Sequence, residues 1–347
     1  MLFRSILDDG AVVRAKFNAY QKSNITICGR GVIDGSAFTR SVANNQVTVP
    51  LDFNYCNNVT FKDFSVLDPA GWCINWYFCT NSTIDGIKII SSRANGDGIS
   101  LQSCTSIAVK GCFVRSWDDS IVIKNYPRWD NRNIQGATRD IIVDNLTLWT
   151  DLAQSMEIGY ETVGKTMSDI TFRNITVLHN FHKPVVSIHN SNNADVTNVL
   201  YDGVTVEDAS MGRGDAGSNN QLVEIAVEYS PTWSNVQATT ELGSISGVTV
   251  RNLTVVGGNA VIPLRVAGSV DVRSGYGNTI HLVKGVIFDN VWIGGRKMKS
   301  GYGYLAVNQY AEATVVEGES RYVVPFVCSQ SDETLAEYGD KLQVVVL

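Results

Sequence analysis

Three aspartates between residues 93 and 124 have the residue type and spacing of a reactive site. Asp97 precedes the pair Gly98-Ile99, and 22 residues after it Asp119 precedes Ser120-Ile121, with Asp118 as its neighbour. Three carboxylates held close together repel one another, so at least one of them keeps its proton to higher pH. Such a group could act as acid and base across a glycosidic bond, or it could hold a divalent cation. A third interpretation is that these aspartates only cap turns.

A degenerate repeat indicates how the chain brings these aspartates together. The unit is apolar-x-apolar-x-(Asp/Asn/Gly)-apolar-x-apolar. Apolar and polar residues alternate as in a strand, and the turn former in mid-unit splits each segment into two short strands that meet at a bend. Val, Ile, Thr and Phe dominate, which disfavours a helical repeat. The copies begin at Ile25, Val59, Ser82, Ile107, Ile141, Ile170, Val199, Val248 and Val286.

Repetition at this interval is typical of a solenoid, in which each unit buries its apolar side against the next unit. The fold class is therefore all-β, and a parallel β-helix fits the pattern best. One rung takes about 22 residues near the aspartates, so Asp97 and Asp119 should stack on adjacent rungs about 4.8 Å apart at the backbone. Gly98 and Ser120 are small and let the chain bend there. Long loops at 125–139 and 208–221 are candidates to close one end of a cleft.

Composition narrows the class of protein. The chain has 347 residues, of which 18% are charged and 44% apolar, as in a soluble globular protein. A net charge of -6 argues against nucleic acid or anionic lipid as a partner. The longest apolar run is too short to span a bilayer. The first residues lack the order of a secretory signal and begin in mid-pattern, so we expect a natural N-terminal segment to be missing.

Cysteines and glycosylation sequons each allow two interpretations. The seven cysteines form an odd set with no Cys-x-x-Cys motif, which favours small core side chains over a disulfide framework or a zinc site. A bridge between Cys73 and Cys79 or between Cys104 and Cys112 is the alternative. The Asn-x-Ser/Thr sequons indicate either glycosylation or bends of the repeat, and their register with the repeat favours bends. They lie at Asn24, Asn58, Asn81, Asn145, Asn174 and Asn252.

The stretch from Ser23 to Lys124 resembles the polygalacturonase-like glycoside hydrolases of family 28. SNITICGRGVIDG is similar to the family's entry motif, and DPAGWCINWYFCTNSTIDGIKI to the rungs that follow it. The segments 95–99, Asn-Gly-Asp-Gly-Ile, and 117–121, Trp-Asp-Asp-Ser-Ile, are similar to the family's two acidic motifs, at the family's interval. The resemblance implies a single-stranded right-handed parallel β-helix.

The same resemblance implies roles for the aspartates. Asp118 would be the general acid, and Asp97 with Asp119 would activate a water on the opposite face, with inversion at the anomeric carbon. It implies no cofactor and no metal, a poly- or oligosaccharide as the partner, and an extracellular or periplasmic location. Asn95 and Lys124 would contact the substrate, although a solvated strand-end lysine is an equal interpretation of Lys124.

Two later motifs of the family are changed in this sequence. The family's histidine is replaced by Gln154, and its arginine and lysine by Ser187 and His189. Because such cations recognise uronate carboxylates, the sequence predicts a substrate other than plain galacturonan. Arg173 or Lys183 could substitute from a loop.

Other candidate substrate contacts surround these positions. Glu157 either hydrogen-bonds sugar hydroxyls or forms a structural ion pair with His189 or Lys183. Trp117 should face the cleft, whereas burial is the default for other tryptophans of the region, and Tyr160 is a candidate for stacking on a sugar ring. His179 and His182 lack partners at a metal-ligand spacing. The other tryptophans of the region are Trp72, Trp76 and Trp129.

The sequence predicts one catalytic β-helix over residues 1–294, with residues 295–347 as its C-terminal cap. The leading functional hypothesis is an inverting glycoside hydrolase. A polysaccharide lyase or sugar epimerase on the same scaffold is the first alternative, disfavoured by the lack of a cationic base among the acids. A non-catalytic glycan-binding β-helix is the second. The sequence does not indicate the oligomeric state.

Overall fold

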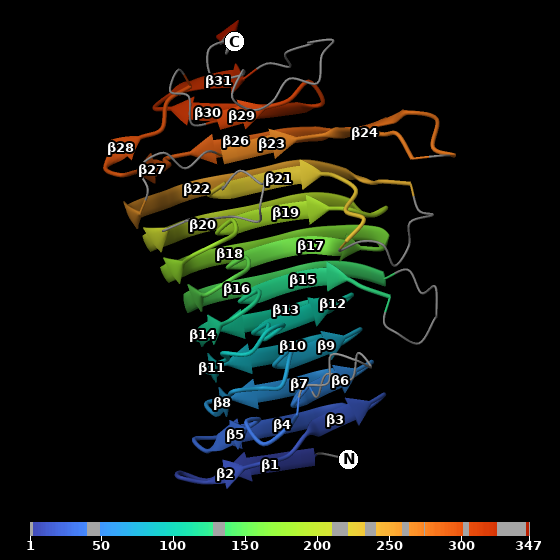
Figure 1. The fold of residues 1–347 in the computed structure, drawn as a ribbon, viewed down its shortest axis with the longest axis vertical. Coiled ribbons are helices and arrows are strands. Elements are labelled where there is room, and N and C mark those ends of the chain that lie inside the picture. Colours follow the sequence, from blue (N-terminus) through green and yellow to red (C-terminus); the bar gives the residue numbers. More distant parts are fainter. Residues whose placement is uncertain are drawn as a thin grey trace.

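The computed structural model describes residues 3–39, 49–127, 136–209, 221–232, 241–258, 264–273, 275–300, 305–324 and 345–346. These residues form strands and connecting turns, with no helix among them. The strands wind into a solenoid whose successive turns stack along its long axis, from β1 (Phe3–Leu7) at one end to β30 (Ala311–Glu317) near the other (Figure 1). In the part of the chain described, no helix has the length and apolar character needed to cross a membrane.

One wall of the solenoid is a ten-stranded sheet, in which every neighbouring pair of strands is parallel. Each strand contributes one rung of this wall. Its strands, in spatial order, are β3 (Phe17–Tyr20), β6 (Leu51–Asn54), β9 (Ile74–Tyr77), β12 (Ile99–Gln102), β15 (Ile121–Asn125), β17 (Met156–Thr162), β19 (Val186–Asn190), β21 (Val223–Val227), β23 (Leu264–Ala267) and β29 (Leu305–Val307).

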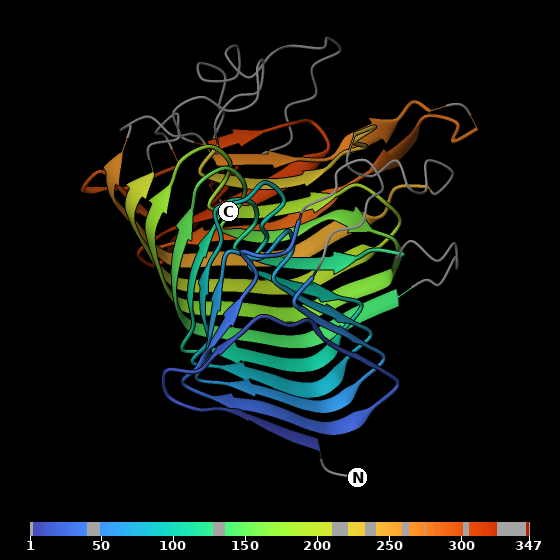
Figure 2. The same cartoon turned by 60° about the horizontal axis from the view of Figure 1, so that its bottom comes forward.

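The other walls begin as two columns of short strands that later merge (Figure 2). The first column holds β1, β4 (Ser23–Gly29), β7 (Asn57–Lys62), β10 (Thr80–Asp85) and β13 (Thr105–Lys110), and the second holds β2 (Val12–Val13), β5 (Val32–Asp34), β8 (Ser65–Leu67), β11 (Lys88–Ile90) and β14 (Phe113–Ser116). Both columns continue into the long bent strands β16 (Gly136–Thr150), β18 (Gly164–Asn180), β20 (Asp195–Ala209) and β22 (Ser244–Gly258).

The register of these walls matches the repeat found in the sequence. Ile25 pairs with Val59, and Ser82 pairs with Ile107. The column then runs onward from Ile107 without a change of register, through Ile141, Ile170, Val199, Val248 and Val286. These six side chains are almost fully buried in one continuous core. The predicted parallel β-helix is therefore confirmed.

The sequon asparagines all have a left-handed backbone and all lie within strands of the walls. All six sequon asparagines have φ between 51 and 60°, a conformation that asparagine tolerates better than most residues. The Asn58 amide donates to the Asn24 side-chain oxygen at 2.7 Å, and the Asn174 amide donates to Asp144 at 2.8 Å. Asn145, Asn174 and Asn252 form the mid-unit bends of β16, β18 and β22, as the structural interpretation of the sequons predicted. The other three lie near the starts of β4, β7 and β10 and not at those bends.

The cysteines behave as core residues. Six of them lie in the described part of the chain, all as free thiols, and all but Cys28 are buried. Neither bridge considered from the sequence is formed there. Burial is the main reason that the pKa of the Cys112 thiol is raised to about 12. Cys328 lies outside the described residues.

Parallel pairing continues beyond the predicted boundary at residue 294. β30 pairs in parallel with β26 (Val283–Asp289), which follows β22. β31 (Ser320–Val324) pairs with β30 in the antiparallel sense, as β24 (Ser269–Asp271) does with β25 (Thr279–His281) and β27 (Trp292–Ile293) with β28 (Arg296–Lys297) earlier in the chain. The division into a helix over 1–294 and a cap over 295–347 stays a prediction. The remaining short strand is β32 (Val345–Val346).

The asparagine bends give a first testable prediction. Replacing Asn174 by alanine puts a less tolerant residue at φ 55° and removes the hydrogen bond to Asp144. We expect the free energy of unfolding in urea to fall by about 1–2 kcal/mol. Asn174→Gly removes the same hydrogen bond but suits the left-handed backbone, so its loss should be smaller. Equal losses in the two variants would show that the backbone conformation is not the source of the effect.

Candidate active site

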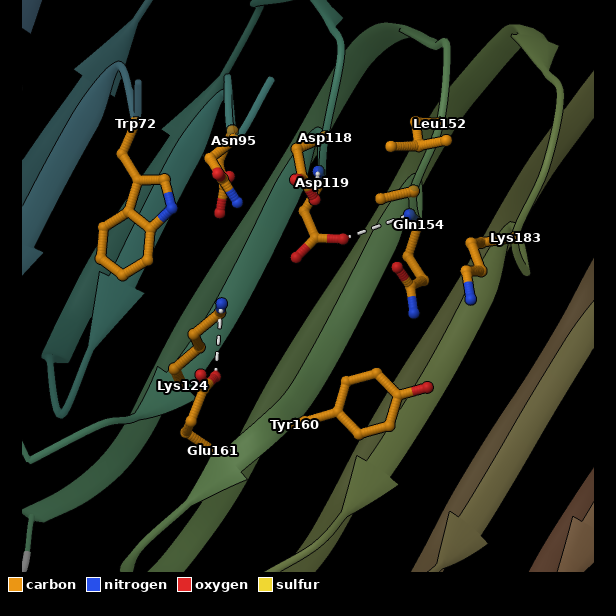
Figure 3. A pocket seen from close by; sticks show the side chains of 12 residues that line it. Trp72, Asn95, Asp118, Asp119, Lys124, Leu152, Gln154, Tyr160, Glu161 and Lys183 are labelled. Atoms are coloured by element: carbon orange, nitrogen blue, oxygen red, sulfur yellow. Dashed lines mark hydrogen bonds and ion pairs between the residues drawn. The ribbon is translucent and has the colours of Figure 1, made fainter. Parts of the chain in front are cut away.

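A pocket of about 300 Å³ opens where the turns before β12, β15, β17 and β19 meet the end of β17 (Figure 3). It holds all three predicted catalytic aspartates. Trp72 lies at one side of the aspartates and Tyr160 at the other. The full lining consists of Trp72, Asn95, Asp97, Asp118, Asp119, Lys124, Leu152, Ala153, Gln154, Tyr160, Glu161 and Lys183.

Backbone hydrogen bonds between rungs fix the aspartates. The Gly98 amide donates to the Asp119 carbonyl at 2.8 Å, which holds the turn bearing Asp97 directly against the turn bearing Asp119. A Cβ atom at Gly98 would lie 2.4 Å from the Ser120 carbonyl oxygen, so only glycine fits there. The expected stacking of these two aspartates on adjacent rungs is therefore present.

A chain of buried hydroxyl groups lies beneath the Asp118–Asp119 turn. The Ser116 hydroxyl donates to the Asp118 carbonyl oxygen at 2.7 Å and also contacts the Ser120 hydroxyl. The Ser120 hydroxyl in turn contacts Thr150, and Thr150 contacts Ser155. All four hydroxyl-bearing residues are fully buried. Because buried polar groups are costly when left unpaired, this chain resists displacement of the turn that carries two of the three acids.

Burial and mutual repulsion raise the pKa of two of the acids. Asp97 and Asp119 are 2% and 7% exposed. In both, burial is the main reason that the pKa lies well above its usual value, and the charge of Asp118 adds to the effect. Lys124 acts in the opposite direction on both. The backbone amide of Gln154 also donates a hydrogen bond to the Asp119 carboxylate at 3.1 Å, which favours the ionised form of Asp119.

Lys124 is the counter-charge of this pocket. Its ammonium lies 3.3 Å from the Glu161 carboxylate and 5.2 Å from the centre of the Trp72 ring. Only 7% of the residue is exposed, so it is not the solvated strand-end lysine considered from the sequence. Burial would lower the pKa of Lys124, but Glu161 and the three aspartates outweigh burial and raise it.

A bulge in β17 brings Tyr160 and Glu161 into the pocket. Ile158 pairs with Ile123 and Thr162 pairs with Asn125, so that the three residues 159–161 face the single residue Lys124. Bulges of this kind redirect side chains and are common beside functional sites. Strict alternation from Glu157 puts Glu161 on the outward face and Tyr160 on the inward face, so the shared side of the two residues depends on the bulge. Glu161 belongs to no motif of the sequence.

Glu157 and His189 lie beneath the pocket floor and not on it. The His189 ring stacks on Tyr160 with 4.2 Å between ring centres and 2° between planes. Its Nδ1 lies 2.8 Å from the Glu157 carboxylate, which also accepts a hydrogen bond from the Ser187 hydroxyl. Both Glu157 and His189 are at most 1% exposed and do not line the pocket. The predicted direct contact of these two residues with a sugar is therefore revised, and Glu157 forms the structural pair with His189.

The remaining predicted residues divide between the pocket and its surroundings. Asn95, Gln154 and Lys183 line the pocket, whereas Trp117 is half-buried beside Asp118 but does not line it. Arg173 pairs with Asp144 on the exposed outer wall at 2.8 Å and is not a pocket residue.

The other aromatic and histidine candidates lie mostly outside the pocket. Trp76 is fully buried in the core. His179 contacts Asp208 at 2.8 Å and packs against Trp149. His182 packs against Phe181. Trp129 lies outside the described residues.

One cluster has side chains of the kind that bind metals. Among the described residues, His189, Glu224 and Glu228 place ligand atoms within 4.8 Å of one another. However, the Arg265 guanidinium lies between the two carboxylates, 2.5 Å from Glu224 and 3.2 Å from Glu228. A divalent cation would have to displace this arginine and lie beside His189, whose pKa the carboxylates raise despite its burial. The cluster is thus suited to internal ion pairs and not to a metal.

Sequence comparison finds a family similarity over the N-terminal part of the chain that bears the aspartates. Residues 3–142 match the family model described as glycosyl hydrolases family 28. The chain is 24% identical over 145 residues to a probable polygalacturonase of Vitis vinifera and 28% identical over 125 residues to a polygalacturonase of Brassica napus. These alignments cover 41% and 33% of this chain, but only 29% and 30% of the two relatives.

Structure comparison extends the likeness in fold to most of the chain. A family 28 exopolygalacturonase of Yersinia enterocolitica is similar with a TM-score of 0.60 at 16% identity, over 90% of this chain and 63% of that one. A hyperthermoactive exopolygalacturonase of Thermotoga maritima gives 0.53 at 16% identity, over 90% and 78%. The fold is thus the single-stranded right-handed parallel β-helix that the resemblance implied. Over residues 3–142 the chain is similar to the glycosyl hydrolases of family 28, and over the rest of the chain the similarity is one of fold.

The raised pKa of Asp119 predicts a stability change of definite sign. The folded state holds this proton more tightly than the unfolded chain, so ionised Asp119 destabilises the fold as pH rises above its unfolded pKa of about 3.9. Asp119→Asn keeps an oxygen for the Gln154 amide and removes the charge. We expect the variant to be more stable than the wild type at pH 7, by on the order of 1 kcal/mol, and the difference to shrink toward pH 4. Thermal unfolding of both proteins at several pH values measures the difference in stability. A stability gain of the variant over wild type that is smaller at pH 7 than at pH 4 would contradict the prediction.

Proposed function

We propose that this protein is an inverting glycoside hydrolase that cleaves a poly- or oligosaccharide other than plain galacturonan. The observation that carries the proposal is the convergence of Asp97, Asp118 and Asp119, from two adjacent rungs, in one pocket. Asp118 is half-exposed at this pocket and is proposed as the general acid. Asp97 and Asp119 are proposed to activate the attacking water together.

Lys124 makes this division of roles workable. A base must be ionised, yet burial and Asp118 favour protonated Asp97 and Asp119. Three coupled carboxyls share their protons, and a nearby positive charge favours the states in which more of them are ionised. Lys124 supplies that charge from a fixed position, since Glu161 and Trp72 hold its ammonium. The lysine thus favours an ionised water-activating pair while one proton remains available to the acid.

Charge in the pocket argues for a substrate without a dense array of carboxylates. The lining carries four acidic side chains and two lysines, and one of the lysines pairs with Glu161. The positions of the family's uronate-binding cations hold Gln154, Ser187 and His189, of which only Gln154 lines the pocket. The other lining lysine, Lys183, comes from the turn before β19. A neutral or sparsely charged glycan therefore fits the lining better than polygalacturonate does.

The same proposal sets the partner and the location. The partner is the glycan itself, with no cofactor in the reaction. An extracellular or periplasmic location is proposed because polymeric glycans of this kind lie outside the cytoplasm. A β-eliminating lyase or an epimerase on the same scaffold, and a non-catalytic glycan-binding role, are the outcomes that the following experiment must separate from hydrolysis.

The decisive experiment is a product screen with wild type and Asp118→Asn on galacturonan, rhamnogalacturonan, dextran, arabinan and galactan. We expect wild type to release reducing ends from one of them with inverted anomeric configuration by NMR, unaffected by a chelator. The variant should lose at least about 100-fold in kcat, as expected for loss of a general acid. Its loss should be much smaller on an aryl glycoside of the released sugar, whose leaving group needs little protonation. An unsaturated product would assign the protein as a β-eliminating lyase, and binding without turnover would assign it a non-catalytic glycan-binding role.

Lys124 gives a separate test of the water-activating pair. Lys124→Met removes the charge that favours ionised Asp97 and Asp119, so their pKa values should rise further. We expect the acidic limb of the kcat/KM profile to move to higher pH. Lys124→Arg keeps the charge and serves as the matched control, with a limb close to that of wild type. An unchanged acidic limb in Lys124→Met would rule out this role of the lysine.

A further inference from the structure

Tyr160 forms one wall of the pocket on an unusually well-fixed support. Its ring lies parallel to the His189 ring, which is fully buried behind it. His189 has an acidic partner at each nitrogen, with Glu157 2.8 Å from Nδ1 and Glu224 3.2 Å from Nε2. The Nδ1 atom is in hydrogen-bond geometry with Glu157, whereas the Nε2 contact with Glu224 has the distance of an ion pair without hydrogen-bond geometry. This hydrogen bond and complete burial fix the ring beneath Tyr160.

The backbone is arranged for this close packing. A Cβ atom at residue 159 would lie 2.2 Å from the His189 carbonyl oxygen, so glycine is required immediately before Tyr160. The bulge of β17 then turns Tyr160 into the pocket. Arg265 continues the ion pairs by binding Glu224 and Glu228. The support therefore extends through β17, β19, β21 and β23, four adjacent rungs of the same sheet.

The charges behind Tyr160 disfavour an anionic ligand on its ring. Glu157, Glu224 and Glu228 outnumber His189 and Arg265, and the face of an aromatic ring is itself weakly negative. Burial is the main reason that the pKa of the Tyr160 hydroxyl is raised, and these carboxylates add to it. The ring can offer dispersion and hydrophobic contact to the C–H face of a pyranose or furanose.

We propose that Tyr160 is a specificity-determining residue that receives an uncharged sugar ring of the substrate by stacking, and that His189 is its positioning residue. The proposal rests on the saccharide substrate of the proposed function and deepens it by assigning the class of sugar taken at this side of the aspartates. Trp72 lies on the opposite side of the acids, so the scissile bond would lie between two aromatic walls (Figure 3). Glu157 and Glu224 act through His189 and not on the sugar.

Binding measurements in the Asp118→Asn background test the proposal without turnover. The probes are tetrasaccharides of dextran, galactan and arabinan, with tetragalacturonate as the charged comparison, and Kd is measured by calorimetry. We expect one neutral probe to bind at least about tenfold more tightly than tetragalacturonate. Tyr160→Ala should weaken its binding at least about tenfold, and Tyr160→Phe, which keeps the ring, by less than about threefold.

The role of His189 is tested by a double-mutant cycle. His189→Asn should weaken binding several-fold in the presence of Tyr160 and have no further effect in Tyr160→Ala, because its contribution passes through the tyrosine. If His189→Asn does not fold, Glu224→Gln removes one of the two supports and should show the same dependence on Tyr160. Additive effects, a preference for tetragalacturonate, full binding by Tyr160→Ala, or no binding of any probe would overturn the proposal.

Failure of this inference can be told apart from failure of the proposed hydrolysis. If the Kd of a neutral probe depends on Tyr160 but wild type releases no reducing ends, the hydrolase proposal is wrong and the stacking site is supported. If wild type hydrolyses a glycan while Tyr160→Ala keeps its Kd and KM, the hydrolase stands and the stacking site falls.

Discussion

The spacing of parallel strands is the constraint on which this structure depends. Interstrand backbone hydrogen bonds hold neighbouring rungs about 4.8 Å apart, and the side chains at one register position cannot separate further than that spacing allows. The hydrogen bond from the Gly98 backbone amide to the Asp119 carbonyl holds the backbones that bear two carboxylates at this interval, despite the repulsion between the charges. A loop could relax to relieve the repulsion, whereas a stack of rungs cannot. Proximity of the acids is thus a property of the backbone, and their proton affinities follow from it.

Two layers of side chains make this concentration of charge tolerable. Lys124 faces the acids from within the pocket, fixed by Glu161 and by the Trp72 ring. Beneath the acids, the hydroxyl chain that starts at Ser116 and Ser120 ties the turn to the next rungs. The first layer balances charge and the second fixes geometry. Both layers run perpendicular to the strands, which is the direction in which a solenoid brings distant parts of the sequence together.

The sequence predicted the features that follow from regular pairing of the strands, and it missed those that depend on the bulge in β17. The apolar positions from Ile107 to Val286 lie in one column, as the repeat indicated, and the asparagine bends and free cysteines follow from the same pattern. Alternation also placed Glu157 on the outward face of β17, but it could not show that this side chain is buried against His189. The bulge adds two residues opposite Lys124 and brings Tyr160 to the side on which Glu161 already lies. Glu224 lies on the rung after that of His189, Arg265 lies on the next one, and neither carries a motif. The ion pairs of His189 with Glu224 and of Glu224 with Arg265 could therefore be found only in three dimensions.

The place of the pocket along the solenoid has a consequence for how the molecule loses structure. Its lining comes from the rungs of β9, β12, β15, β17 and β19, with further rungs on either side of them, from β6 and β3 in one direction and from β21 to β29 in the other. Each rung is stabilised chiefly by its neighbours, so a solenoid tends to come apart from its ends inward. The outer rungs can then unfold and refold locally while the aspartates keep their arrangement in the pocket. Heat or denaturant would shorten this molecule before it dismantles the pocket.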